Sequence, residues 1–237
     1  MPKVAPRPDD FANAAPAGQP HFFAAMPSDM TSRLLERAVT VKLDPGQVLF
    51  LAGDPGDGCY LIDDGLLKVE LASESGIQRI LALLRPGSVV GELSLLDGQP
   101  RSASVSALRA ARLRFIPRLA FDELVARDAG IYRGMAVLLA TRLRDTNLAL
   151  ATANFMAVKG RVAVALVALA EGFGQDVGSG RILIKVRLGQ ADIAAMAGVS
   201  RETASRMLND WLRKGDISRL AGYYCLERPQ VISRAAG

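Results

Sequence analysis

The sequence is poor in the residues from which most catalytic and metal sites are built. Its 237 residues include one histidine, His21, and two cysteines, Cys59 and Cys225, which are far apart. One imidazole is too few for a His-based zinc site or a Ser-His-Asp triad, and two separated thiols form neither a disulfide framework nor a four-thiolate iron–sulfur cluster. We therefore expect buried, structural cysteines, no metal site and no enzymatic activity.

Long hydrophobic runs are missing as well. The longest apolar stretches, such as residues 162–170, fall well short of the about 20 residues that a membrane span needs, and the N-terminus lacks a basic start followed by an apolar signal core. The hydrophobic fraction of 50% is nevertheless enough for two modest cores, and 237 residues exceed one typical domain. The sequence predicts a cytoplasmic protein of two domains that has no membrane partner.

Positive charge is confined to one end of the chain. Residues 1–157 carry 17 Lys and Arg against 17 Asp and Glu, whereas residues 158–237 carry 12 against 7, so the whole net charge of +5 lies in the last third. A basic terminal domain after a neutral body is typical of a nucleic-acid binder. A basic domain without such a partner has the same charge, so the assignment needs a more specific pattern.

Short apolar runs separated by turns occupy residues 39–115. They follow a Pro/Ala/Gly-rich stretch at 1–20, which we expect to be a flexible leader, and a predicted short helix at 28–37. The spacing predicts a small all-β unit with turns at residues 45–46, 54–56, 64–65, 86–87 and 97–98.

A long helix is predicted over residues 131–154. Its apolar stripe has steps of three and four and consists of Met135, Leu139, Leu143, Thr146, Leu150 and Ala153. The length and position of the helix favour a two-fold helix pair between subunits, with packing against the β unit as the alternative. Because a hydroxyl on an apolar stripe needs a hydrogen-bond partner, Thr146 is a candidate ligand contact.

The last third contains the pattern of a helix-turn-helix. After a helix at 158–171, a Gly-rich break at 172–180 and a strand at 182–186, Ala194 precedes Gly198 by four residues, which suits two closely crossing helices joined by a tight turn. Ser200 is the expected N-cap of the second helix, and residues 217–227 read as a hairpin with its turn at 221–222. The side chains expected at the DNA are Ser200, Arg201, Glu202, Thr203, Ser205 and Arg206. A solvated charged face is the alternative.

Residues 91–103, GELSLLDGQPRSA, combine an Arg with small residues on either side of a turn. Gly91 lets backbone N–H groups approach an anion, Arg101 offers a guanidinium to phosphate oxygens and Ser102 adds a hydroxyl. Glu92 would repel the phosphate but can accept a sugar hydroxyl. The pattern predicts a nucleotide site with one small phosphate, and a surface pair between Arg101 and Glu92 is the alternative.

This stretch is similar to the phosphate-binding cassette of cyclic-nucleotide-binding domains, and residues 21–231 resemble the CRP/FNR superfamily of bacterial transcription regulators. The resemblance implies an α+β protein with a cyclic-nucleotide-binding β-roll at 21–130, a dimerisation helix at 131–156 and a winged helix-turn-helix domain at 157–237. It also implies a homodimer that binds double-stranded DNA and meets RNA polymerase. The nucleotide contacts that it implies are Gly91, Glu92, Leu93, Ser94, Arg101, Ser102, Ala103, Thr146 and Asn147.

This chain differs from the cAMP-binding members at two positions, which concern the choice of nucleotide and the coupling of nucleotide binding to DNA binding. Those members have Thr-Ser where this chain has Thr146-Asn147, and an amide both donates and accepts, so cAMP is expected while cGMP stays open. They also have an Asp near the position of Ala157. This position joins the dimerisation helix to the winged-helix domain, and the resemblance implies that a bound nucleotide reorients the winged-helix domain through this junction.

The DNA site and the alternatives follow from the same resemblance. Arg201, Glu202 and Arg206 match the residues with which cAMP-binding members read a TGTGA half-site, so a two-fold dimer implies a palindrome. A regulator of the same fold with another effector, or DNA binding without a ligand, stays open. Control of an attached enzyme is disfavoured because no segment is left for a catalytic domain.

Overall fold

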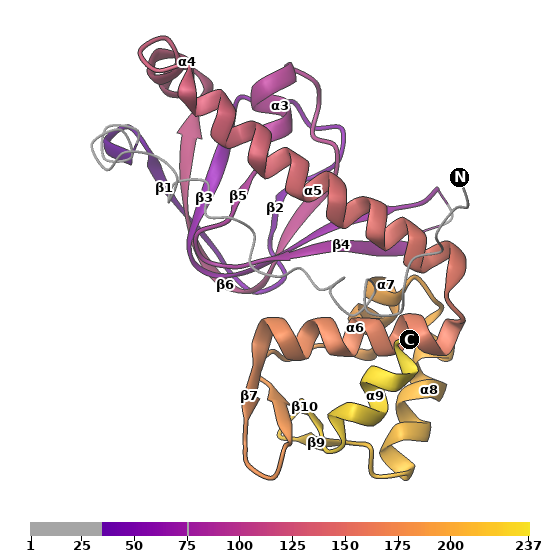
Figure 1. Cartoon of the computed structure of the whole chain (residues 1–237). Helices are drawn as coiled ribbons and strands as arrows, with labels where there is room; N and C mark the ends of the chain where they lie inside the picture. Colours follow the sequence, from indigo (N-terminus) through magenta and orange to yellow (C-terminus); the bar gives the residue numbers. More distant parts are fainter. Residues whose placement is uncertain (1–34, 75) are drawn as a thin grey trace. The chain divides into compact units, whose positions relative to one another are not determined.

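The computed structural model describes residues 35–74 and 76–237, so the predicted leader at 1–20 and most of the predicted helix at 28–37 lie outside it. The chain forms two compact units that divide between Leu143 and Arg144. Figure 1 follows the chain through them.

The first unit is built on an antiparallel sheet (Figure 1). Its strands are β1 (Val39–Leu43), β2 (Val48–Phe50), β3 (Gly58–Ala72), β4 (Gln78–Leu84), β5 (Val89–Val90) and β6 (Ser104–Pro117). The order is β1-β6-β3-β4, with β2 paired to β6 and β5 paired to β3. Leu67, Val105 and Leu113 are among the buried side chains of its core.

One of the turns predicted from Asp-Gly pairs is wrong, and another ends a helix that was not predicted. At Asp64-Gly65 the chain does not reverse, because β3 continues through an irregularity at which its register with β6 shifts. Gly65 has φ +99, and a Cβ there would lie 2.4 Å from the Ala110 carbonyl oxygen, so the close strand approach requires glycine. Asp97-Gly98 ends a short helix, α3 (Glu92–Asp97), with Gly98 in the left-handed region.

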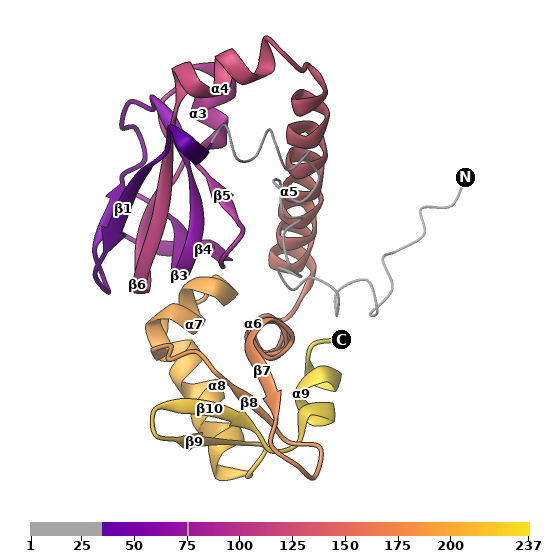
Figure 2. The same cartoon turned by 90° about the vertical axis from the view of Figure 1, so that its left-hand side faces the viewer.

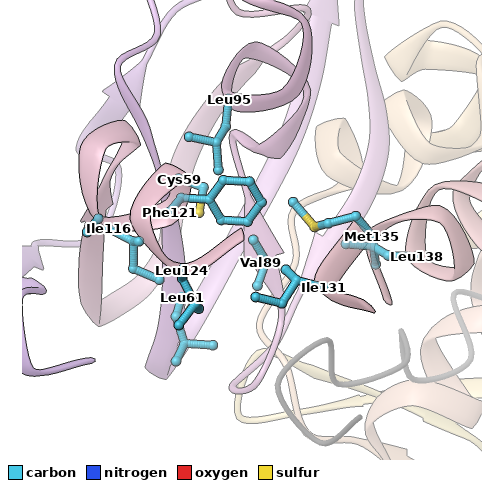
Figure 3. Close-up of a cluster of buried hydrophobic side chains, with 11 residues drawn as sticks. Cys59, Leu61, Val89, Leu95, Ile116, Phe121, Leu124, Ile131, Met135 and Leu138 are labelled. Atoms are coloured by element: carbon cyan, nitrogen blue, oxygen red, sulfur yellow. The ribbon is translucent and has the colours of Figure 1, made fainter. Parts of the chain in front are cut away.

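Helix α3, α4 (Arg118–Val125) and the first half of α5 (Gly130–Phe155) share one hydrophobic cluster. Figure 3 shows Leu95 of α3, Phe121 of α4 and Met135 of α5 converging there, beside Cys59. The predicted helix at 131–154 is thus confirmed. Ile131 and Leu138 join Met135 in this cluster, whereas Leu139 of the predicted stripe is not among its members.

The second unit has the predicted winged helix-turn-helix arrangement (Figure 2). It contains α6 (Val158–Phe173), β7 (Gly174–Asp176), β8 (Ile182–Ile184), α7 (Gln190–Ala197), α8 (Arg201–Arg213), β9 (Ile217–Leu220), β10 (Tyr223–Leu226) and α9 (Pro229–Ala235). Its sheet, in the order β7-β8-β10-β9, lies against α6 and α8. Strand β7 within the predicted Gly-rich break and helix α9 were not predicted.

The fold is therefore of the expected α+β class, with helices and antiparallel sheet in both units. In the part of the chain that the structure describes, we find no helix with the length and apolar character of a membrane span.

Candidate functional site

The stretch 91–103 folds as a glycine, the short helix α3 and a loop that leads into β6. Gly91 precedes the helix with φ +84, a conformation that glycine adopts without strain. Leu93 on α3 and Ser102 are exposed, whereas Ala103 is buried. The predicted site residues of this stretch therefore lie beside β3, some of them buried and some exposed.

Arg101 is the buried centre of this segment. Only 4% of its surface is exposed. Its Nη1 donates to the carbonyl oxygens of Gly58 at 2.9 Å and Gly91 at 2.8 Å. Its guanidinium also lies 4.5 Å from the ring centroid of Phe50. The alternative of a surface pair between Arg101 and Glu92 is therefore wrong.

Glu92 has a different cationic partner. Its carboxylate is buried and accepts from Arg142 Nη1, while Arg142 Nη2 donates to the Val89 carbonyl. Sequence reasoning missed Arg142. One feature of the sequence could have indicated Arg142 as a site residue. It precedes the candidate ligand contact Thr146 by four residues, which puts the two side chains on the same face of the helix.

Buried polar atoms beside Arg101 have capacity for a further partner. Ser94 Oγ and Arg101 Nε are buried and have no hydrogen-bond partner. At Gly56, a Cβ would lie 2.4 Å from Ser94 Cβ and 3.0 Å from Arg101 Cζ, so only glycine lets the main chain approach both side chains this closely. An orphaned hydroxyl and an orphaned guanidinium N–H side by side suit an anionic oxygen, such as that of a phosphate diester.

The surroundings of this cluster are poorly solvated. Burial, followed by the negative charge of Glu92, raises the pKa of the Cys59 thiol to about 12. Burial likewise raises the pKa of Tyr60, against the opposing effect of Arg101. A charge placed here is weakly screened, so an Arg101–phosphate contact would be strong.

The remaining predicted nucleotide contacts, Thr146 and Asn147, lie on α5 in the second compact unit and are exposed. Their contact with a nucleotide stays a prediction. Leu143 and Leu150 are 61% and 60% exposed, so part of the predicted apolar stripe is uncovered in the single chain.

The helix-turn-helix is formed by α7 and α8. Gly198 ends α7 with φ +60, and its N–H donates to the carbonyl of Ala194, as the spacing of these two residues predicted. Ser200 caps α8, since its hydroxyl accepts from the Thr203 N–H at 3.2 Å.

The first turns of α8 present the predicted charged side chains. Arg201, Glu202 and Arg206 are exposed, whereas Ser205 is half-buried beside Asn209. The pKa of Glu202 is lowered by its hydrogen bond to its own backbone amide, followed by the Ser200 hydroxyl. The exposed face of these turns thus combines two guanidiniums with one carboxylate, a set of groups that suits base edges.

The wing is the β9–β10 hairpin. Its turn lies at 221–222 as predicted, with Ala221 at φ +49 and Gly222 at φ +86, the conformation of a tight two-residue hairpin. Helix α6 has Ala157 as its N-cap, so no side chain caps the N–H groups of its first turn.

Comparisons with known proteins match both units. Residues 40–128 match the family model of the cyclic nucleotide-binding domain, and residues 160–232 match that of the Crp-like helix-turn-helix domain. A CRP-like cAMP-activated global transcriptional regulator of Mycobacterium tuberculosis is 36% identical over 190 residues, which cover 78% of this chain and 84% of the relative.

Two proteins of Thermus thermophilus extend the similarity. Its cyclic AMP receptor protein is 37% identical over 170 residues, covering 72% of this chain and 75% of the relative. The solved structure of TTHA1359, a transcriptional regulator of the CRP/FNR family, superposes with a TM-score of 0.69 at 26% identity, covering 84% of this chain and 98% of that one.

Proposed function

The chain belongs to the CRP/FNR family of transcription regulators, and on that premise we propose that it is a homodimeric DNA-binding protein whose affinity for DNA is controlled by cAMP. The family consists of transcription regulators and not of enzymes, and this chain carries both its cyclic nucleotide-binding domain and its DNA-binding helix-turn-helix. The names of the relatives in Mycobacterium tuberculosis and Thermus thermophilus support cAMP as the effector.

The cluster around Arg101 is the observation that carries the nucleotide part of the proposal. A buried guanidinium with an unpartnered N–H, next to an unpartnered Ser94 hydroxyl and the closely packed main chain at Gly56, suits one phosphate diester. In the bound state Arg101, Ser94 and Ser102 would hold the phosphate, and Glu92 would accept from the ribose 2′-hydroxyl while it stays paired to Arg142.

We assign the hydrogen bonds to the nucleotide base to Thr146 and Asn147. A Thr hydroxyl and an Asn amide both donate and accept, so they suit the amino group and ring nitrogen of adenine. The same amide also suits the guanine edge, which makes cGMP the second candidate ligand. Asn147 is therefore the residue to replace when the two are compared.

Dimerisation is assigned to α5. Exposed apolar side chains such as Leu143 and Leu150 on this helix would be covered by the same helix of a second copy. A nucleotide that contacts the paired helices binds one helix arrangement better than the other, and this difference in affinity would shift the winged helices into position for DNA.

The recognition helix α8 is assigned to a TGTGA half-site. Arg201 and Arg206 would donate to guanine O6 and N7, and Glu202 would accept from a cytosine amine. Two such helices about 34 Å apart match one turn of a palindromic duplex. As a DNA-binding regulator the protein would act in the cytoplasm, together with RNA polymerase.

The test is fluorescence anisotropy of a labelled TGTGA-N6-TCACA duplex at fixed salt, with protein alone, with cAMP and with cGMP. We expect tight binding with cAMP only. A response to cGMP alone would retain the mechanism and change the ligand. Binding that is indifferent to both nucleotides would refute the nucleotide control and leave a DNA-binding protein of this family without it.

A further inference from the structure

Arg118, the first residue of α4, touches three segments of the nucleotide-binding unit at once. Its Nη1 donates to the Leu95 carbonyl at 2.6 Å, and its Nη2 donates to the carbonyls of Ser94 at 2.5 Å and Gly56 at 3.3 Å. Its backbone N–H donates to the Asp57 carbonyl at 2.7 Å. One side chain thus joins α3, the loop at residues 56–57 and the start of α4.

The segments that Arg118 joins are two walls of the proposed phosphate site. Ser94 on α3 has the buried, unpartnered hydroxyl, and Gly56 faces both Ser94 and Arg101. Arg118 itself bonds to the carbonyls of these residues, on the main-chain side, and not to the hydroxyl or to Arg101. It therefore holds the walls in register without occupying the site.

The acceptors of Arg118 suit a positioning role. Ser94 and Leu95 lie within the six-residue helix α3, where a cation next to carbonyls near the C-terminal end is favourable. A helix of six residues is too short to be stable alone, so its orientation depends on contacts such as these. A planar guanidinium with several N–H donors can bridge three carbonyls, whereas a lysine ammonium cannot span them with the same fixed geometry.

We propose that Arg118 is a positioning residue for cyclic nucleotide binding, which acts by fixing Ser94 and α3 against the Gly56 wall. This inference rests on the proposed function. Removal of the guanidinium leaves Arg101 and Glu92 in the chain but frees the wall that carries the Ser94 hydroxyl. In metal sites, replacement of the outer residues that orient the ligands commonly changes affinity by about 10- to 100-fold, and we expect an effect of this size here.

The test is calorimetric titration of the full chain with cAMP and with cGMP. Arg118→Gln should weaken binding by about tenfold or more, and Arg118→Lys should lie between it and the wild type. Arg127→Gln makes the same charge change at an exposed position just after α4 and should leave the affinity unchanged.

A double-mutant cycle with Ser94 separates positioning from a general loss of stability. If Arg118 acts through Ser94, Ser94→Ala should weaken binding in the wild type but have little further effect in Arg118→Gln. Wild-type affinity in Arg118→Gln, or two losses that simply multiply, would overturn the inference while the proposed function stands. If Arg118→Gln does not fold, Arg118→Lys carries the same cycle. A wild type that binds neither nucleotide would overturn the proposed function, and this inference with it.

Discussion

Breaking the Glu92–Arg142 pair should destabilise the first unit by amounts that depend on which partner is removed. The side chain of Glu92 is 2% exposed and that of Arg142 is 22% exposed. Arg142→Gln leaves a carboxylate buried without its cation, which costs about 3–5 kcal/mol. In Glu92→Gln the guanidinium keeps the Val89 carbonyl and reaches water, so we expect a loss of about 1–2 kcal/mol.

Urea unfolding with two probes measures this difference. Trp211 is the only tryptophan and is buried in the second unit, so its fluorescence reports that unit alone. Hydrogen exchange of the β3 and β6 amides reports the first unit. With a urea dependence of about 2 kcal/mol per molar, the midpoint of the first unit should fall by about 1.5–2.5 M in Arg142→Gln and by about 0.5–1 M in Glu92→Gln.

The double variant provides the sharpest refutation. Glu92→Gln combined with Arg142→Gln removes the buried charge, so it should be more stable than Arg142→Gln alone. Equal losses in the two single variants, or a double variant less stable than both, would contradict the reasoning. The Trp211 transition should not move in any of them, and a shift there would show that the effect is not confined to the first unit.

Four further predictions concern single positions. Arg101→Lys keeps the charge but loses the planar fork, so cAMP affinity measured by calorimetry should fall by about 10- to 100-fold, and undiminished affinity would remove Arg101 from the phosphate site. Ser200→Ala deletes the cap of α8 and should lower the unfolding free energy of the second unit by about 1 kcal/mol in Trp fluorescence, whereas no change would mean that the cap contributes nothing. Cys59, whose pKa burial raises to about 12, should not react with a disulfide reagent at pH 8 until urea unfolds the chain, so fast labelling of the native protein would contradict its burial. Leu150→Glu places a charge on the exposed apolar side of α5 and should shift sedimentation from dimer to monomer, and an unchanged dimer would exclude this face as the interface.

Local signals in the sequence predicted the second unit well. The Ala194–Gly198 spacing and the Ser200 cap each depend on neighbours within four residues, and the structure has both contacts. The wing turn at 221–222 is equally local. The long helix was also predictable, because α5 is long enough for its period to show.

Contacts between distant residues escaped prediction. Glu92 and Arg142 are 50 residues apart, and neither position alone indicates the other. Arg118 donates to main-chain carbonyl oxygens, which every residue type has, so the sequence of the accepting segments does not indicate the contact. The Asp64-Gly65 pair has the composition of a turn but serves as an irregularity within β3, since strand pairing to β6 continues on both sides. Helix α3 is too short for its period to be detected.

The glycines around Arg101 limit what can be read from related sequences. A Cβ at Gly58 would lie 2.3 Å from the Ile116 carbonyl oxygen, and one at Gly91 would lie 2.4 Å from Arg101 Nη1. The contact with the main chain requires glycine at Gly58, and the φ of +84 favours glycine at Gly91. Descendants that changed or lost their effector would retain these glycines for the sake of the fold. Under the proposed function, a difference in effector between such proteins is expected at the proposed base contact, Asn147, and not at Gly58 or Gly91.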